Sequence, residues 1–351
     1  MTYIKKPAVR HPGLEKNALG LTLRDYEGSM STLCAGCGHD SITAAIIRAC
    51  HALSIAPHTV AKLSGIGCSS KTPTYFLGGA HGFNSAHGRM PAIATGAGAA
   101  NRRLLLLGVS GDGDSLSIGL GQMAHAIRRN LRMTYILENN GVYGLTKGQF
   151  SASTDLGSKS RRGDPNVVPP IDPVLLALSI GATFVARSFS GDKDQLVPIL
   201  EAALCHDGLA FVDVISPCVT FNDHEGSTKS YAYVRKHGLP VVHADFVPPA
   251  DPITLEQEPG TTQIVPLHGG ARVRLTKVAQ DYDPRDRVRA FAFVQEHLAR
   301  GEIVTGLLFL DESRPSMHEV MGTVETPLVE LPYESLCPGA AALDAITEQW
   351  R

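Results

Sequence analysis

The sequence predicts an α/β fold in which a parallel β-sheet is flanked by helices. Across residues 31–218, short apolar runs alternate with helix-length segments, and glycines separate the two, as in strands joined by crossover helices. Residues 104–110 (LLLLGVS) are apolar over the length of one strand, which is typical of a central strand buried on both faces. The chain has 351 residues, 43% of them hydrophobic, which is enough to build a substantial core.

The other elements of this region are expected in chain order. Residues 1–30 contain prolines and scattered charge without a sustained period, so we expect an extended N-terminal arm. Asp40 or Ser41 can cap a helix that runs toward Leu53. After the apolar strand we expect a helix and then a second strand, over residues 116–130 and 133–137.

The alternation weakens after Cys218. Residues 245–275 are rich in Pro and Gly and predict a linker or surface arm. A helix over residues 288–298 and a strand over residues 304–310 follow. We therefore expect an N-terminal arm, a main domain, and an irregular C-terminal arm or small subdomain that packs on a partner subunit: residues 1–30, 31–240 and 241–351.

Composition excludes several classes of protein. The chain has 32 Lys and Arg residues and 34 Asp and Glu residues, so its formal net charge is −2. It lacks the net positive charge that is typical of nucleic-acid-binding proteins. No apolar run approaches the ~20 residues of a membrane-spanning helix. The N-terminus has no apolar stretch that would make it a secretory signal. We expect a cytoplasmic protein that binds neither nucleic acid nor membranes.

The most informative stretch joins the apolar strand to the next one. Asp112 lies between Gly111 and Gly113, directly after the strand, and a helix N-terminus that favours phosphate follows. A carboxylate there would repel a phosphate group unless a cation lay between them, so the motif suggests Mg²⁺ bridging the protein to a diphosphate. Asn140 and Gly141 come one helix and one strand later, and parallel strands would bring both motifs to one edge of the sheet. The alternative is two ordinary strand-to-helix turns, since DG and NG are common turn pairs.

The chain has seven cysteines, and in a reducing compartment structural disulfides are rare. Cys34, Cys37, Cys68 and Cys218 are candidates for a redox dithiol, a zinc site or an iron–sulfur cluster, and spacing alone does not choose among them. Cys50 and Cys205 lie in apolar helical stretches, where we expect buried structural cysteines. Cys337 has no assignment.

Several motifs occur in the order seen in one family. GDG followed by NN resembles the thiamine-diphosphate motif of transketolases, decarboxylases and 2-oxoacid oxidoreductases. The series CAGCGHDSI, GIGCSSKTPTYF, AHGRMPAIATG, SGDGD, NNGVYGLTKGQ and SPCVTFN resembles β subunits of 2-oxoacid:ferredoxin oxidoreductases, closely over residues 31–225 and more loosely beyond. The resemblance implies a thiamine-diphosphate-binding fold of the diphosphate-binding type. Residues 31–240 would then be the domain that binds thiamine diphosphate and an iron–sulfur cluster.

The resemblance also assigns the site residues. It implies that Asp112, Asn140 and the Val142 carbonyl bind Mg²⁺, and that Cys34, Cys37, Cys68 and Cys218 hold a 4Fe–4S cluster. Zinc, which has no redox chemistry, could not remove electrons from the reacting substrate. Further contacts to thiamine diphosphate are expected from the same motifs: Gly111, Gly113, Asp114, Ser69, Ser70 and His87.

The remaining candidates concern the substrate. His87 matches a histidine near the reacting carbon and is a candidate for proton transfer, or else an ordinary loop histidine; His39, His81 and His224 are more typical of structural histidines. Lys71 and Leu145 match positions that line the substrate pocket, and a cation at Lys71 suits the carboxylate of a 2-oxoacid. The loop YGLTKGQ resembles the 2-oxoglutarate and broad-specificity branch of the family. Residues 150–154 (FSAST) depart from the usual Ser-Pro-Thr, which leaves the conformation of this loop and the fine selectivity open.

The chain is expected to be half of an active site. By resemblance, a separate α subunit supplies the pyrimidine-binding module and the catalytic glutamate, in an αβ or (αβ)₂ complex. Coenzyme A and ferredoxin are the implied co-substrate and electron acceptor, so that 2-oxoglutarate, coenzyme A and oxidised ferredoxin reversibly give succinyl-CoA, CO₂ and reduced ferredoxin. The alternatives are a pyruvate or branched-chain 2-oxoacid enzyme, a non-catalytic iron–sulfur electron-transfer subunit, and a thiamine decarboxylase with zinc at the cysteines.

Overall fold

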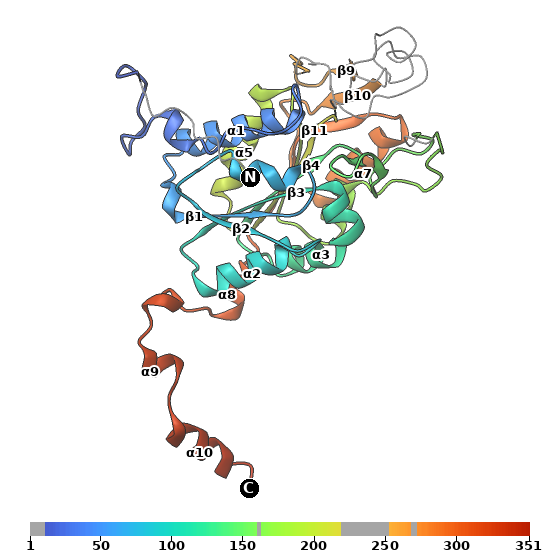
Figure 1. Ribbon diagram of the computed structural model, residues 1–351. Coiled ribbons are helices and arrows are strands. Elements are labelled where there is room, and N and C mark those ends of the chain that lie inside the picture. Colours follow the sequence, from blue (N-terminus) through green and yellow to red (C-terminus); the bar gives the residue numbers. More distant parts are fainter. Residues whose placement is uncertain (1–10, 160–162, 219–252, 268–271) are drawn as a thin grey trace, which may run out of the picture.

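Nine strands form one continuous sheet in the computed structural model, which describes the chain except for residues 1–10, 160–162, 219–252 and 268–271. The strand order is β2-β1-β3-β4-β8-β7-β11-β10-β9 (Figure 1). The first six strands in this order are all parallel to one another. Their bounds are Val60–Ser64 (β1), His81–Asn84 (β2), Leu105–Gly111 (β3), Met133–Asn139 (β4), Phe184–Phe189 (β7) and Leu209–Ile215 (β8). The predicted parallel α/β fold is confirmed.

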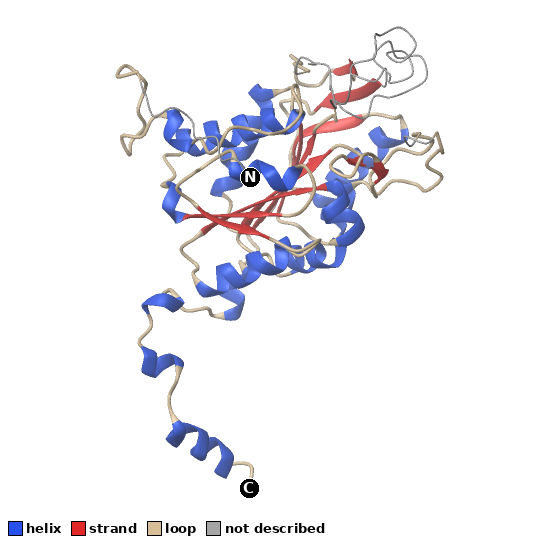
Figure 2. Cartoon of the chain, viewed as in Figure 1, coloured by secondary structure: helices blue, strands red, loops and turns tan. Residues whose placement is uncertain are grey.

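Helices cover both faces of this sheet and enclose two apolar cores (Figure 2). Successive residues of a strand point to opposite faces, so in β4 Tyr135 joins one core and Ile136 the other. One face packs against α1 (Gly38–Ala52) and α5 (Lys193–Cys205). The other packs against α2 (Met90–Ala100), α3 (Leu120–Arg128), α4 (Pro173–Ser179) and α7 (Arg287–Ala299). Because both faces are covered, the central strands read as continuous apolar runs.

Two helix boundaries differ from the predicted ones. Helix α1 starts at Gly38 and not after Asp40 or Ser41: Cys37 is its N-cap, and Asp40 lies in the first turn, where a negative charge favours the helix dipole. The helix predicted over residues 116–130 is two helices, a short π-helical segment, η4 (Gly113–Ile118), and then α3. They meet at Gly119, whose Cα lies so close to the Gly88 backbone that a Cβ there would come within 2.8 Å.

The prediction of a linker over residues 245–275 was wrong for its second half. Strands β9 (Thr262–Pro266) and β10 (Arg272–Lys277) form an antiparallel pair, and β10 runs parallel to β11 (Ile303–Leu310). Strand β11 pairs antiparallel with β7, so these three strands extend the main sheet. The helix predicted over residues 288–298 and the strand over residues 304–310 are confirmed by α7 and β11. The boundary at residue 240 lies outside the described residues.

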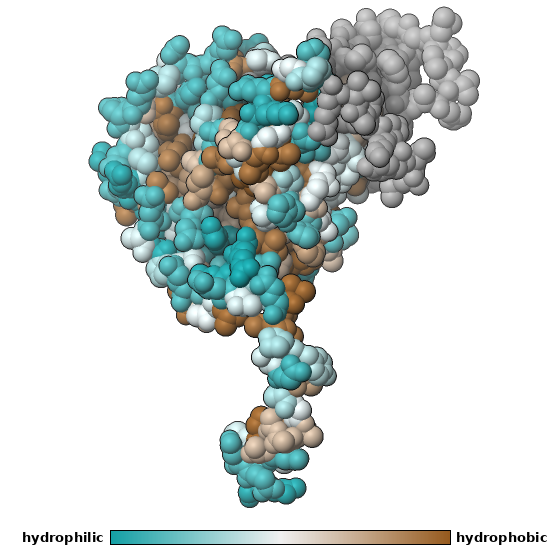
Figure 3. Space-filling view, turned by 90° about the vertical axis from the view of Figure 1, so that its left-hand side faces the viewer, coloured by the Kyte–Doolittle hydropathy of each residue, from teal (hydrophilic) through white to brown (hydrophobic). Residues whose placement is uncertain are grey.

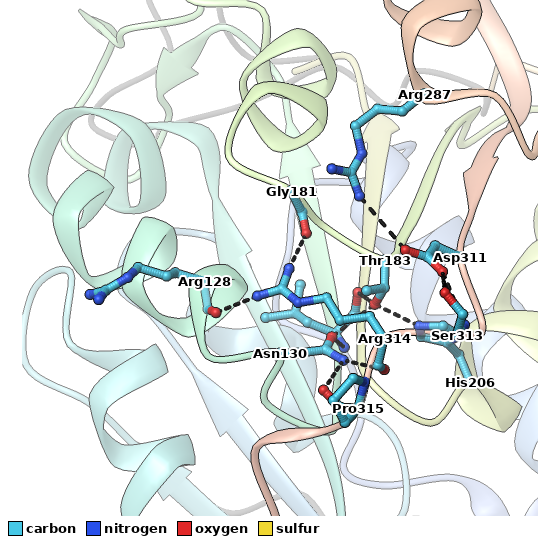
Figure 4. A network of polar contacts seen from close by, with 11 residues as sticks. Arg128, Asn130, Gly181, Thr183, His206, Arg287, Asp311, Ser313, Arg314 and Pro315 are labelled. Atoms are coloured by element: carbon cyan, nitrogen blue, oxygen red, sulfur yellow. Dashed lines mark hydrogen bonds and ion pairs between the residues drawn. The ribbon is translucent and has the colours of Figure 1, made fainter. Parts of the chain in front are cut away.

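Polar contacts fasten the segment after β11 to the body (Figure 4). The Arg314 guanidinium donates to the carbonyl oxygens of Gly181 and Arg128. Asn130, which is buried, donates through Nδ2 to the Pro315 carbonyl at 3.1 Å and accepts through Oδ1 from the Thr183 hydroxyl at 2.8 Å. This segment is therefore an integral part of the fold.

From residue 324 the chain leads off the body through short helices, and Glu330 still pairs with Arg103 of the body at 3.1 Å (Figure 1). Its apolar side chains are uncovered: Val329 is 90% exposed and Trp350 is 86% exposed. Figure 3 shows apolar surface in brown on the body as well, including the region where this tail begins. The elements of this tail are η5 (Leu328–Glu330), α9 (Tyr333–Leu336) and α10 (Ala340–Glu348), and the short helix α8 (Met317–Met321) precedes it on the body.

The two cysteines expected to be buried differ. Cys50 is fully buried in α1, as predicted. Cys205 is exposed, because it is the last residue of α5 and faces solvent where that helix ends. In the N-terminal arm, Tyr26 is fully buried and its hydroxyl accepts from Asn17 Nδ2 at 2.8 Å, so the later part of the arm packs on the body. No helix in the described part of the chain is long and apolar enough to span a membrane.

Candidate functional site

The motifs singled out in the sequence lie at one edge of the sheet. Because β1, β2, β3, β4 and β8 are parallel, their carboxyl ends point the same way. The segments with Cys68, His87, Asp112, Asn140 and Cys218 each follow one of these ends. Helix α1 runs back along the sheet and begins at the same edge, just after Cys37. This is the edge at which open α/β sheets bind their ligands.

Asp112 is buried at the end of β3 and is surrounded by donors. Its Oδ2 accepts hydrogen bonds from the hydroxyls of Ser151 and, at 2.6 Å, Ser153. Its Oδ1 lies 3.5 Å from the backbone nitrogen of Asn140. Burial raises the pKa of Asp112, and the bonds from Ser151 and Ser153 oppose that rise. The structure thus brings together Asp112 and Asn140, which the sequence places on different strands.

The turn after β4 is tightly built. Gly141 has a φ of 69°, a backbone conformation that glycine adopts without strain. The Asn140 side-chain oxygen accepts from the Val142 N–H at 3.0 Å. Next in the chain, the Tyr143 hydroxyl donates to the Gly113 carbonyl at 2.9 Å, and a Cβ on Gly113 would overlap the Tyr143 ring. Gly113 therefore permits close packing of one turn on the other, and Gly141 permits the backbone conformation of the second turn.

Asp114 joins the other loops to this turn. It is buried, and its carboxylate accepts from the Gly88 N–H at 2.7 Å and from the Ser110 hydroxyl at 2.8 Å. A Cβ on Gly65, which follows β1, would overlap the same carboxylate. His87, next to Gly88, is exposed to solvent. Asp114 thus fixes the backbone that carries His87, with its oxygens engaged by the protein itself.

Ser69 and Ser70 begin the short helix η3 (Ser69–Thr74), directly after Cys68. Their hydroxyls donate to the Ile66 and Gly67 carbonyls, at 3.2 and 2.8 Å. A Cβ on Gly111 would lie 3.0 Å from the Ser69 hydroxyl, so η3 packs against the start of the GDGD motif. The structure therefore places the Cys68 turn beside the Asp112 turn.

The four candidate cysteines are half-buried and share one neighbourhood. Burial raises the pKa of Cys68 to about 11, with further effects from Cys218, Lys71 and Cys34. Burial also raises the pKa of Cys37, and Cys218 adds to that rise. Within the described ranges, no three His, Cys, Asp or Glu side chains are grouped so as to hold a metal ion.

The atoms that could bind a metal differ in chemistry between the surroundings of Asp112 and the four candidate cysteines. Around Asp112 they are the oxygens of its carboxylate, of the two serine hydroxyls and of the Asn140 side chain, which fit a hard ion such as Mg²⁺. At the other position they are thiols from the segment before α1, the turn after β1 and the segment after β8. Thiolates fit a soft centre, and a cubane bound through one thiolate per iron atom needs its ligands further apart than a single ion does.

The substrate candidates lie around the same edge. Lys71 is a half-buried residue of η3, and its positive charge acts to lower the pKa of Cys68. Leu145 lies between the short strands β5 (Val142–Tyr143) and β6 (Gln149–Phe150) and is 49% exposed. His81 is exposed on β2, whereas His39 is buried. His224 lies outside the described residues.

Sequence reasoning missed the hydroxyl groups of residues 151–154. Strands β5 and β6 form a hairpin that returns the chain toward Asp112. Besides the two serines that bind Asp112, the Thr154 hydroxyl donates to the Gly141 carbonyl at 2.5 Å. The available signal was the hydroxyl-rich run FSAST. Its departure from Ser-Pro-Thr bears on the loop conformation and does not indicate that its hydroxyls bind Asp112 and Gly141.

Comparisons with known proteins agree with this geometry. Residues 65–214 match the family "Thiamine pyrophosphate enzyme, C-terminal TPP binding domain", and residues 272–326 match the family of C-terminal regions of the pyruvate ferredoxin oxidoreductase beta subunit. The chain is 42% identical over 226 residues to a 2-oxoacid:ferredoxin oxidoreductase subunit beta of Saccharolobus solfataricus, which covers 64% of this chain and 72% of that protein.

Two further relatives bear on the substrate. The 2-oxoglutarate oxidoreductase subunit KorB of Mycobacterium tuberculosis is 42% identical over 218 residues, which covers 60% of this chain and 57% of the relative. A solved structure of 2-oxoglutarate:ferredoxin oxidoreductase from Magnetococcus marinus, with 2-oxoglutarate, coenzyme A and succinyl-CoA bound, superimposes with a TM-score of 0.68 at 28% identity. That match covers 92% of this chain and 98% of the other.

Proposed function

This chain belongs to the family of β subunits of 2-oxoacid:ferredoxin oxidoreductases, and from that premise we propose that it binds thiamine diphosphate through Mg²⁺ beside a 4Fe–4S cluster and acts on 2-oxoglutarate. The observation that carries the proposal is the convergence of the Asp112 and Asn140 turns with the cysteine-bearing segments at one edge of the sheet. A protein that only transfers electrons would need the cysteine-bearing segments but not the Asp112 and Asn140 turns.

The oxygen ligands would hold the Mg²⁺ ion that joins the protein to the diphosphate. Asp112, the Asn140 side chain and the Val142 carbonyl would hold Mg²⁺, which neutralises a diphosphate next to the buried carboxylate. Gly111 and Gly113 would face the diphosphate with their backbone. Ser69, which packs against Gly111, and the neighbouring Ser70 would serve as donors. Thiamine diphosphate, when bound, supplies the electron sink for cleavage of the bond between the keto carbon and the carboxylate.

The thiols would bind the iron–sulfur cluster that accepts electrons. Cys34, Cys37, Cys68 and Cys218 would bind the cluster, which accepts electrons one at a time. Burial raises the pKa values of Cys37 and Cys68, so binding of the cluster to their thiolates would release protons, as metal binding to thiols does. The Lys71 ammonium beside Cys68 opposes the rise in the pKa of that thiol.

Other residues of the edge would handle the substrate. Lys71 would pair with a carboxylate of 2-oxoglutarate, and Leu145 would form part of the pocket wall. His87, exposed on the loop that Asp114 holds, would donate or accept a proton near the reacting carbon. The proposal for 2-oxoglutarate is supported by the relatives of that specificity and by the loop from Tyr143 to Gln149.

Partners would complete the reaction. As a β subunit, the chain pairs with an α subunit. We propose that the α subunit supplies the pyrimidine-binding module and a glutamate, in an αβ or (αβ)₂ assembly. Coenzyme A would accept the succinyl group and ferredoxin the electrons, in a reversible reaction.

The experiment is a substrate comparison on the anaerobically purified αβ complex. Reduction of ferredoxin is followed with coenzyme A and either 2-oxoglutarate, pyruvate or a branched-chain 2-oxoacid. We expect the highest kcat/KM with 2-oxoglutarate. Faster turnover with pyruvate would overturn the substrate assignment, and no ferredoxin reduction with any 2-oxoacid would overturn the proposed function.

A further inference from the structure

Glu138 is an unusual residue for the interior of this protein. It lies on β4, opposite Gly111 of β3, and is fully buried. Neither of its carboxyl oxygens has a hydrogen-bond partner within the described part of the chain. The Thr72 hydroxyl lies near enough to act on the pKa of Glu138, but this hydroxyl donates to the Ser69 carbonyl at 2.8 Å. A buried carboxyl group without a partner is costly, and each such group in a folded protein requires an explanation.

A second polar group near this carboxyl is His39. Its Nδ1 lies 3.6 Å from Glu138 Oε2 and 2.7 Å from the Ser216 hydroxyl. All three side chains are buried. A hydrolytic Ser–His–acid triad uses both ring nitrogens, one toward each partner, whereas here the serine and the carboxylate face the same nitrogen. The arrangement is therefore not a nucleophilic site.

Sequence positions connect this group to the cysteines. His39 follows Cys37 by two residues and Ser216 precedes Cys218 by two residues. The Ser216 N–H donates to the Asn139 carbonyl at 2.8 Å, next to Glu138. The packing is tight, since a Cβ on Gly38 would come within 2.6 Å of the Ser216 hydroxyl. Two cysteine-bearing segments, far apart in the chain, are thus tied to the end of β4.

Glu138 also lies close to the thiols themselves. Its charge is one of the influences on both Cys37 and Cys68, although burial affects the pKa of each thiol more strongly. The carboxyl group is therefore near enough to both thiols for its charge to act on them. Partners of metal ligands are commonly arranged in this way, behind the ligands and on a rigid strand.

We propose that Glu138, His39 and Ser216 are positioning residues that hold the Cys37 and Cys218 segments in the geometry that receives the iron–sulfur cluster. This inference rests on the cluster of the proposed function. His39 fastens the start of α1 to the segment after β8 through its 2.7 Å contact with Ser216, and the Glu138 carboxyl group lies 3.6 Å from the same ring nitrogen. None of the three touches the reacting atoms.

The test measures retention of iron by the αβ complex. The variants His39→Ala and Ser216→Ala are purified anaerobically, and the release of iron to a chelator is followed together with the EPR spectrum of the reduced cluster. We expect release about 10- to 100-fold faster than in the unmodified complex. Ser216→Thr, which keeps the hydroxyl, should restore slow release.

Two further variants separate positioning from general stability. His318→Ala breaks a comparable buried contact, between His318 Nδ1 and the Thr323 hydroxyl at 2.9 Å, at the far end of the fold, and should leave iron release unchanged. Glu138→Leu removes the unpartnered carboxyl group, so it should not lower the melting temperature, yet it should speed iron release. If His39→Ala does not fold, Ser216→Ala and Glu138→Leu decide the question.

Unchanged iron release and EPR spectra in Ser216→Ala and Glu138→Leu would overturn the inference. Failure of the proposed function looks different. In that case the unmodified complex itself would contain no iron or sulfide, whatever the state of its variants.

Discussion

Asp112 combines burial with an unusual number of neutral donors. Two serine hydroxyls bind its Oδ2, and the Asn140 backbone approaches its Oδ1. Burial raises the pKa of this carboxyl group, so the folded protein favours its protonated form more than water does. A cation bound at Asp112 would reverse that preference, because it stabilises the carboxylate.

Asp112→Asn tests this role, since it keeps the size of the side chain and removes its charge. We expect the affinity of the αβ complex for Mg²⁺ and thiamine diphosphate, measured by isothermal titration calorimetry, to fall about 100-fold. The iron content of the complex should not change. The exposed Asp194, in the first turn of α5, provides the control Asp194→Asn. Equal affinities in the two variants would refute the assignment of Asp112.

The same carboxyl group predicts a pH dependence. Its pKa is raised, so protons compete with Mg²⁺ at a higher pH than they would for an exposed aspartate. Affinity for Mg²⁺ and thiamine diphosphate should therefore weaken as pH falls toward that pKa. In Asp112→Asn this part of the pH dependence should disappear.

At the residue scale, the sequence predicts which side chains meet at the site when they belong to recognisable motifs, and it predicts other contacts less well. Asp112 and Asn140 could be paired because each follows a recognisable apolar strand. Ser151 and Ser153 could not, because their contact with Asp112 depends on the path of the β5–β6 hairpin. Cys205 shows the same limit, since an apolar helix sequence does not reveal which side of its last turn faces solvent.

At the scale of elements, a buried ion-pair network joins β7, β8 and α4. Arg187 on β7 donates to Asp213 on β8 at 2.6 Å and to Asp172, the N-cap of α4, at 2.8 Å. Asp213 also accepts from the side chain of Asn139 at 3.1 Å, beside the candidate site. The network therefore links the core packing of three elements to the end of β4.

Arg187→Met should lower the free energy of unfolding by about 3–5 kcal/mol, because it leaves two carboxylates without their cation in the interior. Urea denaturation measures this loss. The control is Arg132→Met, which breaks a largely exposed pair with Asp207 at 3.2 Å and should cost at most about 1 kcal/mol. A loss at Arg187 no larger than that at Arg132 would show that the buried network is not important for stability.

Elements were predictable where burial gives a clear pattern. β3 and β4 are covered on both faces, so their apolar runs are unmistakable. β9 and β10 are not: they form the antiparallel end of the sheet, and exposed and buried residues mix along them within a stretch rich in Pro and Gly. The split between η4 and α3 escaped prediction because it depends on the close approach of Gly88 to Gly119.

At the scale of the whole molecule, the body and the tail have different roles. The segment up to residue 323 is held by Arg314, Asn130 and the buried Met317. Beyond it, residues 324–351 expose large apolar side chains that include Val329 and Trp350. We propose that this tail packs on the α subunit, as expected of the C-terminal arm.

Deletion of residues 324–351 tests the division. The isolated β chain should keep its unfolding free energy within about 0.5 kcal/mol, because the deleted side chains make few buried contacts. Its co-purification with the α subunit should decrease strongly. A deletion that begins at Arg314 is the contrasting control and should destabilise the body. Undiminished co-purification after the shorter deletion would refute a role of the tail in assembly.

The family was predictable at this scale because its motifs follow one another in order through residues 31–225. The arrangement of the site was predictable in part, since parallel strands must bring their carboxyl ends to one edge. The buried group of His39, Glu138 and Ser216 was not, because these residues lie far apart in sequence. The motifs that contain His39 and Ser216 do not show that their side chains meet.

The most direct test of the central claim is the cofactor content of the anaerobically purified αβ complex. If the edge of the sheet holds both centres, each αβ unit should contain one thiamine diphosphate and about four iron and four sulfide, and Cys218→Ser should lose iron while Cys50→Ser keeps it. A colourless complex that contains zinc in place of iron, or one that retains no thiamine diphosphate in the presence of Mg²⁺, would contradict the claim.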